Sequence, residues 1–237
     1  MKKALVLTSN KRRHMYLTHQ VAKNFDLVGI ISEPKKDYYS NQADESELVA
    51  KHLQKLTETE ADYFETVEFA PADLKLIDRK SLNDDLVVEW ASAKEPEVIF
   101  LFGTGILRDG WLNTFDGKIV NLHLGYSPFY RGSATLFWPF YNRDVSKLGT
   151  TIHIAAKKVD AGGILDNVLL DKNDDCGNYY HMTNKLIKKS LDEFPIVVDK
   201  YLNAEISPKD QDLSLGSIYK RKDFTEDKLK FVLENYT

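Results

Sequence analysis

Short apolar runs alternate with amphipathic stretches along the first half of the chain. Residues 4–8 and 27–32 are apolar runs of strand length, and residues 15–24 between them have apolar positions at helical spacing. Two further strand-length runs follow at 98–102 and 119–123, and the first of these has the composition of a strand covered on both faces. This order of strands and helices predicts an α/β protein with a doubly wound, mostly parallel sheet of the Rossmann-like kind.

The remaining periodic segments predict further helices and one more strand. The helices are expected at 46–59, 81–92, 133–141 and 175–201, and the strand at 66–69. Ser81 or Asn83 could cap the second of these helices. Because proline lacks an N–H group, Pro139 should kink or restart the third helix and Pro195 could divide the fourth. Residues 32–41 predict a polar connection without a functional signal.

The pattern changes after Asn203. Beyond it lie a polar stretch rich in turn formers, a strand-like stretch and a short amphipathic helix, at 206–212, 215–221 and 225–236. We therefore expect a catalytic domain at 1–203 and a small strand-containing appendage at 204–237. Since a small strand pair rarely stands alone in water, the appendage is the expected interface of a homodimer.

Composition excludes several classes of function. With 237 residues, 43% of them apolar and 29% charged, the chain has the make-up of a soluble globular protein. A formal net charge of −4 argues against a general nucleic-acid binder. The single cysteine, Cys176, cannot form an internal disulfide, which suits a reducing cytoplasm. No apolar stretch approaches the roughly 18 residues of a membrane span, and the run at 4–7 is too short for a signal peptide, so we expect a cytoplasmic protein without a membrane partner.

Residues that can carry chemistry concentrate between positions 118 and 165. Side chains alternate faces along a strand, so Asn121 and His123 would share one face of the 119–123 strand. Asp160 follows in a loop where Gly162 and Gly163 free the backbone for a tight turn. If this loop folds back onto the strand, a carboxylate, an imidazole and an amide meet. Such a set suits acyl transfer to an amine, because the carboxylate can keep the imidazole protonated or take up a proton through it while the imidazolium and the amide stabilise an oxyanion.

Four motifs in this region carry a family resemblance. They are Asn121-Leu122-His123, Pro128-Phe129-Tyr130-Arg131-Gly132, Gly149-Thr150-Thr151-Ile152-His153 and Val159-Asp160-Ala161-Gly162-Gly163-Ile164-Leu165. In this order they resemble the formyltransferases that use N10-formyltetrahydrofolate. The resemblance implies that family's fold and assigns catalytic roles to Asn121, His123 and Asp160. Two positions depart from the pattern: Gly125, where the family often has Ser, and Ser127, where it often has Leu.

The 98–102 strand ends in a glycine-flanked segment, where a planar ligand could lie. By resemblance, this segment and the loop that contains Asp160 hold N10-formyltetrahydrofolate as co-substrate, with the pterin against main-chain groups. The residues so implied are Gly103, Thr104, Gly105, Ile106, Leu107, Lys158 and Val159. A plain strand end with turn glycines is the alternative. We expect His153 to be a structural histidine, and no set of His, Cys, Asp and Glu has metal-ligand spacing.

Two segments are candidates for binding the acceptor. The first holds Asn10, Lys11, Arg12, Arg13 and His14, after a strand where α/β folds bind phosphate, but it lacks the usual glycines. Its cations would grip a diphosphate through their side chains, unless they form a solvated surface run. In the second segment, Tyr126 and Tyr130 could stack on a base or sugar or pack in the core, and Arg131 could anchor a phosphate or hold the turn.

The charged first loop and residues 126–135 are most similar to the sugar N-formyltransferases, which act on nucleotide-linked amino sugars of surface polysaccharides such as the lipopolysaccharide O-antigen. A dTDP-4-amino-4,6-dideoxyhexose is the expected acceptor. A glycinamide ribonucleotide transformylase would have a glycine-rich phosphate loop. A methionyl-tRNA formyltransferase would have an extra C-terminal domain, and the negative net charge of this chain disfavours binding of tRNA. Two rival hypotheses stay open: a formyltetrahydrofolate hydrolase with the same triad, and a non-catalytic folate- or nucleotide-binding module.

Overall fold

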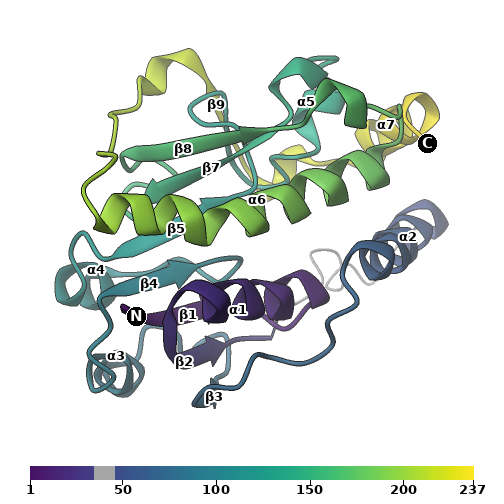
Figure 1. The fold of residues 1–237 in the computed structure, drawn as a ribbon. Helices are drawn as coiled ribbons and strands as arrows, with labels where there is room; N and C mark the ends of the chain where they lie inside the picture. Colours follow the sequence, from purple (N-terminus) through teal and green to yellow (C-terminus); the bar gives the residue numbers. More distant parts are fainter. Residues whose placement is uncertain (35–45) are drawn as a thin grey trace.

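The computed structural model describes residues 1–34 and 46–237, and the strands in these ranges form two sheets (Figure 1). The larger sheet contains β1 (Lys3–Thr8), β2 (Asp26–Ser32), β3 (Leu74–Leu76), β4 (Val98–Leu101), β5 (Ile119–His123), β7 (Gly149–Ile154) and β8 (Ile164–Leu169). Its order is β3-β2-β1-β4-β5-β7-β8. The strands up to β5 pair in parallel, and β7 and β8 continue the sheet in antiparallel fashion. The predicted mostly parallel α/β fold is confirmed.

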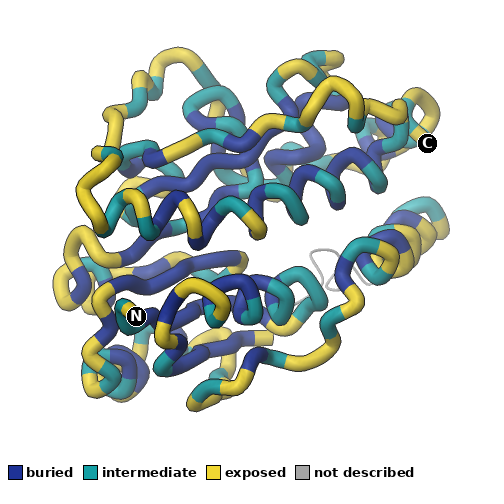
Figure 2. Tube along the Cα trace, in the orientation of Figure 1, coloured by how far each residue is buried: buried dark blue, intermediate teal, exposed yellow. Residues whose placement is uncertain are grey.

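Helices cover both faces of this sheet. They are α1 (Arg12–Asn24), α2 (Glu47–Tyr63), α3 (Asp85–Ser92), α4 (Asp109–Thr114), α5 (Trp138–Tyr141), α6 (Tyr179–Leu202) and α7 (Glu226–Asn235). Side chains of β1 alternate between two cores: Ala4 and Val6 pack with α1 and α6, whereas Leu5 and Leu7 pack with α3 and α4. In Figure 2 the central strands are accordingly buried along most of their length.

Several helix ends differ from the predicted ones. The first helix begins at Arg12 rather than near residue 15, so part of the basic run forms its first turn. Helix α3 begins after Asp84, not at Ser81 or Asn83. Helix α5 begins only at Trp138, because the missing N–H of Pro139 costs nothing in a first turn. The helix predicted at 175–201 is observed as α6 and is not divided at Pro195, which is buried inside the helix.

The strand predicted at 66–69 is wrong. Val67 is 58% exposed, and the edge strand that pairs with β2 is β3, where Ile30 lies opposite Leu74. Helix α4 was not predicted at all, because its six residues include Gly110 and are too few to show helical periodicity. Most of the predicted 32–41 connection lies outside the described residues.

The C-terminal segment packs against the rest of the chain. Its strand β9 (Ser217–Tyr219) pairs in parallel with β6 (Tyr130–Gly132), a strand where the sequence predicted a turn. On α7, Leu229 and Val232 are fully buried in the core that contains α6. The strand partner of the appendage is therefore in the body of the same chain, and the homodimer interface stays a prediction.

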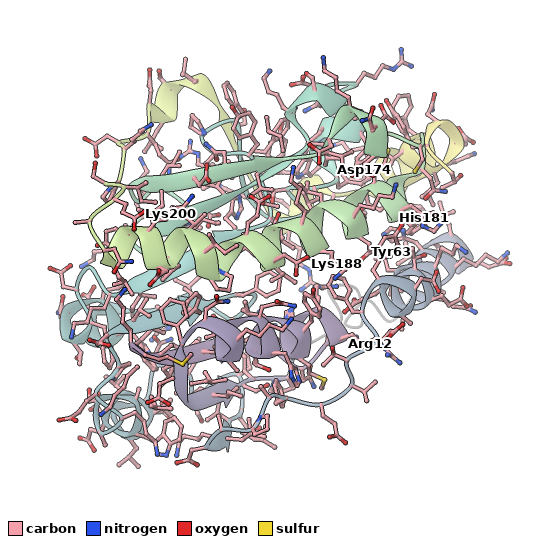
Figure 3. All side chains as sticks on the ribbon, viewed as in Figure 1. Arg12, Tyr63, Asp174, His181, Lys188 and Lys200 are labelled. Atoms are coloured by element: carbon pink, nitrogen blue, oxygen red, sulfur yellow. The ribbon has the colours of Figure 1, made fainter. Side chains whose placement is uncertain are left out.

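Helix α2 lies beside the amino-terminal end of α6. Figure 3 labels Tyr63 and His181 at this contact, where the Tyr63 hydroxyl lies 3.0 Å from His181 Nδ1. Only three α2 residues are buried, and its partly buried apolar residues Leu48, Val49 and Leu56 pack against the core. None of the helices in the described ranges is both long and apolar enough to cross a bilayer.

Candidate active site

Strand β5 carries two of the predicted catalytic side chains to one wall of a cavity. The neighbouring antiparallel strand β7 places His153 directly opposite Asn121 and Thr151 directly opposite His123. Because directly opposed side chains of paired strands lie on the same face of a sheet, His153 joins Asn121 and His123 on one surface. The alternation of strand side chains therefore produces a cluster of three polar groups, one more than the β5 strand supplies.

Asp160 reaches this cluster from the loop between β7 and β8. Its Oδ1 lies 3.4 Å from His123 Nδ1 and 3.8 Å from His153 Nε2, and its Oδ2 accepts a hydrogen bond from the Gly132 N–H at 3.0 Å. The side chain of Asp160 is 12% exposed. Its backbone φ of 51° is in the left-handed region, which non-glycine residues rarely adopt, so the loop must be held by its surroundings.

The imidazole of His123 is oriented from both sides. Its Nε2 lies 3.0 Å from the Tyr130 carbonyl oxygen, which can only accept a hydrogen bond. Its Nδ1 faces the Asp160 carboxylate. Two acceptors around one ring are complementary to the imidazolium form, in which both nitrogens carry protons. The arrangement thus fixes the orientation of the ring between the Tyr130 carbonyl and the Asp160 carboxylate, beside the cavity.

His153 fixes the amide of Asn121. The Nδ1 of His153 lies 2.8 Å from the Ile154 carbonyl oxygen and therefore carries the proton, which leaves Nε2 to accept from Asn121 Nδ2 at 3.0 Å. Burial lowers the pKa of His153, and the nearby charge of His123 lowers it further, so the neutral form with this acceptor persists at neutral pH. The histidine expected to be structural is thus satisfied by hydrogen bonds, and it also decides which way the Asn121 amide faces.

A cavity of about 1360 Å³ connects the cluster to both predicted binding regions. Asn121, His123, His153 and Asp160 line it, as do residues 103–107 and Val159. The 103–107 segment is held by the Gly105 N–H donating to Glu33 Oε1 at 2.5 Å and by Asn83, which contacts both Ile106 and Arg108. Lys158 is exposed and does not line the cavity.

The basic run forms part of the cavity wall and is tied to α2. Arg13 donates to Glu60 from its backbone N at 3.0 Å and from Nη1 at 2.5 Å. Arg12, labelled in Figure 3, donates from Nη1 to the Phe64 carbonyl at 3.2 Å. Lys11, Arg12 and Arg13 line the cavity, whereas Asn10 and His14 do not, and the His14 ring is fully buried against Phe102. The three cations therefore belong to a cavity wall rather than to a solvated surface run.

The other predicted acceptor contacts lie away from the cavity. Tyr130 is 5% exposed, stacks on Tyr219 and donates its hydroxyl to Asp144. The buried guanidinium of Arg131 donates to the Pro128 and Leu213 carbonyls, each at 3.2 Å. Tyr126 packs against the Phe129 ring. Tyr130 therefore packs in the core rather than facing a base or sugar, and Arg131 holds the turn rather than binding a phosphate at the cavity.

A family model described as formyl transferase matches residues 2–194. The chain belongs to the formyl transferase family. A curated relative, the methionyl-tRNA formyltransferase of Chloroflexus aurantiacus, is 28% identical over 149 residues, which are 62% of this chain and 47% of that protein. This chain therefore spans about half the length of the curated relatives it matches.

Solved structures of formyl transferases share the fold at low sequence identity. A 4-N formyltransferase from Francisella tularensis has a TM-score of 0.62 and 18% identity, covering 99% of this chain and 87% of that one. A sugar 3N-formyl transferase solved with dTDP and 5-N-formyl-THF has a TM-score of 0.59 and 17% identity, covering 95% and 72%. Glycinamide ribonucleotide transformylase 1 from Symbiobacterium toebii has a TM-score of 0.61 and 16% identity, covering 89% and 95%. The resemblance found in the sequence is confirmed.

Gly125, which departs from the family's frequent Ser, has no room for a side chain. A Cβ there would lie 2.4 Å from the Tyr130 carbonyl oxygen and 2.5 Å from His123 Nε2. We expect Gly125→Ala to push the imidazole off its carbonyl acceptor and lower kcat for formyl transfer by about 10²-fold, since a displacement of about 1 Å at reacting groups has this effect. Steady-state kinetics would measure it, with Gly110→Ala as a fold control, since a Cβ there would meet only Val88 at an ordinary 3.9 Å. Unchanged kcat in Gly125→Ala would show that the His123 position is not critical.

His52 on α2 is one of the residues that line the cavity. Its Nδ1 lies 2.9 Å from the Tyr180 hydroxyl, and its ring centroid is 5.5 Å from that of Tyr180. Burial lowers the pKa of His52 from 6.5 to about 4. Between these two pH values the unfolded chain takes up a proton at this site and the folded chain does not, so the free energy of unfolding falls as the pH falls, by about 3 kcal/mol in total.

His52→Gln should therefore flatten the dependence of stability on pH. The amide keeps a hydrogen-bonding group for Tyr180 but does not titrate. We expect chemical denaturation between pH 7 and pH 4 to give a smaller loss of unfolding free energy for the variant than for the wild type. His19→Gln, at a partly exposed histidine on α1, is the matched control. Identical slopes for wild type and His52→Gln would contradict the assignment.

Sequence reasoning missed the parts of the site that lie outside the motifs. His153 could have been found from its place in the third motif, once β7 is paired with β5. His52 and Gln211, which contacts the Asp160 loop, sit in polar stretches with no motif. Among the described residues no group of three or more His, Cys, Asp and Glu is arranged to hold a metal ion.

Proposed function

We propose that this formyl transferase moves the formyl group of N10-formyltetrahydrofolate to the primary amine of a nucleotide-linked amino sugar, with a dTDP-4-amino-4,6-dideoxyhexose as the specific acceptor. The observation that carries the proposal is the set of side chains that line one cavity. The 103–107 segment, the His123–Asp160 pair and the cations Arg12 and Arg13 all face it. The 103–107 segment suits a planar donor, the His123–Asp160 pair suits acyl transfer and the cations suit a diphosphate.

The residues of the cluster fit a formyl donor through their chemistry. The bound folate would supply the formyl carbon that the acceptor amine attacks. Asn121 and the His123 imidazolium stabilise the negative charge that develops on the formyl oxygen as the carbon becomes tetrahedral. The Asp160 carboxylate takes up the proton that the attacking nitrogen loses, and a proton is returned to the folate nitrogen when its bond to the formyl carbon breaks.

Two comparisons support an amino sugar as acceptor. The matches to the sugar 3N-formyl transferase and the 4-N formyltransferase named above cover 95% and 99% of this chain, whereas the match to the glycinamide ribonucleotide transformylase covers 89%. Rings of Tyr179 and Phe224 line the cavity together with Arg12 and Arg13, which would place aromatic faces for a nucleobase beside cations for its phosphates. We further propose a cytoplasmic homodimer that acts in the synthesis of a surface polysaccharide.

The deciding experiment offers the protein a panel of amines. It is incubated with N10-formyltetrahydrofolate and, separately, with dTDP-amino sugars, other nucleotide amino sugars, glycinamide ribonucleotide and methionyl-tRNA. We expect a dTDP-4-amino sugar to gain the mass of one CO unit. Formylation of methionyl-tRNA or glycinamide ribonucleotide alone would reassign the acceptor. Formate release without any amine would indicate a hydrolase, and binding of donor and nucleotide without turnover would indicate a non-catalytic module.

A further inference from the structure

A segment of the C-terminal appendage crosses directly over the catalytic loop. We call residues 206–219 the strap. Its backbone at Lys209 exchanges two hydrogen bonds with Ile164, both of 2.8 Å, immediately after the Asp160 loop. Its far end is β9, which pairs with β6. The strap is therefore fixed on either side of the point where it passes Asp160.

Gln211, between these two anchors, binds the Asp160 loop from outside. Its side-chain Nε2 donates to the Asp160 carbonyl oxygen at 3.1 Å and to the Gly162 carbonyl oxygen at 2.6 Å. The two protons of one amide group thus hold both ends of a three-residue turn. On its other side, Gly162 is packed closely against β7: a Cβ added to this glycine would lie 1.9 Å from the Ile154 carbonyl oxygen. This close packing leaves the turn no room to move inward.

The carboxylate of Asp160 is held by the same strap through β6. Its Oδ2 accepts from the Gly132 N–H, and Gly132 is packed so closely on β9 that an added Cβ would lie 2.2 Å from the Tyr219 carbonyl oxygen. The Ser133 N–H donates to that carbonyl at 2.9 Å. Both the backbone and the side chain of Asp160 are therefore positioned by residues that are bonded to the strap.

We infer that Gln211 is a positioning residue for formyl transfer: it holds Asp160 in its left-handed backbone conformation, so that the carboxylate faces His123. Gln211 does not line the cavity, so it acts through Asp160 rather than on a ligand. Without its two hydrogen bonds, the strained turn loses the contacts that keep Oδ1 within 3.4 Å of the imidazole. The inference rests on the proposed role of the Asp160–His123 pair, but it does not depend on which amine is the acceptor.

Gln211→Met tests this role. Methionine has a similar length and fills the same space but donates no hydrogen bond. We expect kcat to fall by about 10- to 100-fold, as for a slight misplacement of a catalytic group, while KM for N10-formyltetrahydrofolate stays within about threefold. Lys209→Ala is the matched control, because Lys209 holds the strap through its backbone and its side chain is exposed. It should keep the wild-type kcat.

A second measurement needs no acceptor. The ring signals of His123 are followed by NMR over a pH series in wild type, Gln211→Met and Asp160→Asn. We expect the curve of Gln211→Met to move from the wild-type curve toward that of Asp160→Asn. A folded Gln211→Met with wild-type kcat and an unmoved His123 curve would overturn the inference, as would a loss of activity that appears only in KM. If no amine in the panel is formylated, the proposed function fails while the NMR result still decides the role of Gln211.

If Gln211→Met does not fold, Gln211→Glu takes its place. Glutamate keeps the shape and polarity of the side chain but presents oxygens to the Asp160 and Gly162 carbonyls. We expect it to show the same shift of the His123 curve. Wild-type behaviour of a folded Gln211→Glu would overturn the inference in the same way.

Discussion

His123→Asn is expected to lower kcat for formyl transfer by about 10³-fold, within the range observed for loss of a general acid or base. The shorter neutral amide cannot carry the positive charge that faces the cavity, and it leaves the Asp160 carboxylate without its partner at 3.4 Å. Steady-state kinetics with N10-formyltetrahydrofolate and the most rapidly formylated amine of the panel would measure the change.

The matched control for this change is His181→Asn. His181 lies on α6, its Nδ1 bonds the Tyr63 hydroxyl outside the catalytic cluster, and its replacement should leave kcat within about threefold of wild type. A folded His123→Asn protein that keeps more than about a tenth of the wild-type kcat would refute the catalytic role of the imidazole.

Asp160→Asn should be nearly as damaging, again by about 10³-fold in kcat. The amide oxygen can still accept from the Gly132 N–H, so the side chain keeps this contact and the change removes chiefly the negative charge. Without that charge the imidazolium of His123 loses its counter-ion, and the proton of the attacking amine loses its acceptor. Kinetics over a pH series, together with a thermal midpoint for each protein, would separate this chemical loss from unfolding.

Asp166→Asn on β8 is the control for the loss of one carboxylate. Asp166 is exposed and accepts only from the backbone N–H of Asn167 among the bonds of the described residues, so its neutralisation should not affect the reaction. Equal activity of Asp160→Asn and Asp166→Asn would mean that charge at Asp160 plays no part in formyl transfer.

The sequence predicted the central features of the fold because local patterns determine them. Strand β5 was predicted with its observed bounds, since its apolar residues and its two polar side chains alternate. Strand β3 was missed, because an edge strand of three residues with exposed Leu74 and Leu76 has no pattern that separates it from a loop. Strand β6 was missed since its partner β9 lies far along the chain, and no local signal records such pairing.

The candidate site was predictable where motifs carry it and not elsewhere. The family resemblance predicted that Asn121, His123 and Asp160 share one site, and in the structure all three line one cavity. The uses of Arg12 and Arg131 could not be told apart from residue type, because both are arginines beside turns. Only their partners distinguish them: Arg12 lines the cavity and donates to the Phe64 carbonyl, whereas Arg131 lies away from the cavity and donates to the Leu213 carbonyl.

The place of the strap in the chain has a consequence during protein synthesis. A ribosome makes the strands that carry Asn121, His123 and Asp160 well before it makes residues 206–219. The sheet can begin to fold as it emerges, since amino-terminal parts of nascent chains generally fold first. The loop of Asp160 is secured only when the strap has left the exit tunnel and paired with Ile164 and β6. The nascent chain can therefore begin to fold before its catalytic loop is fixed in position.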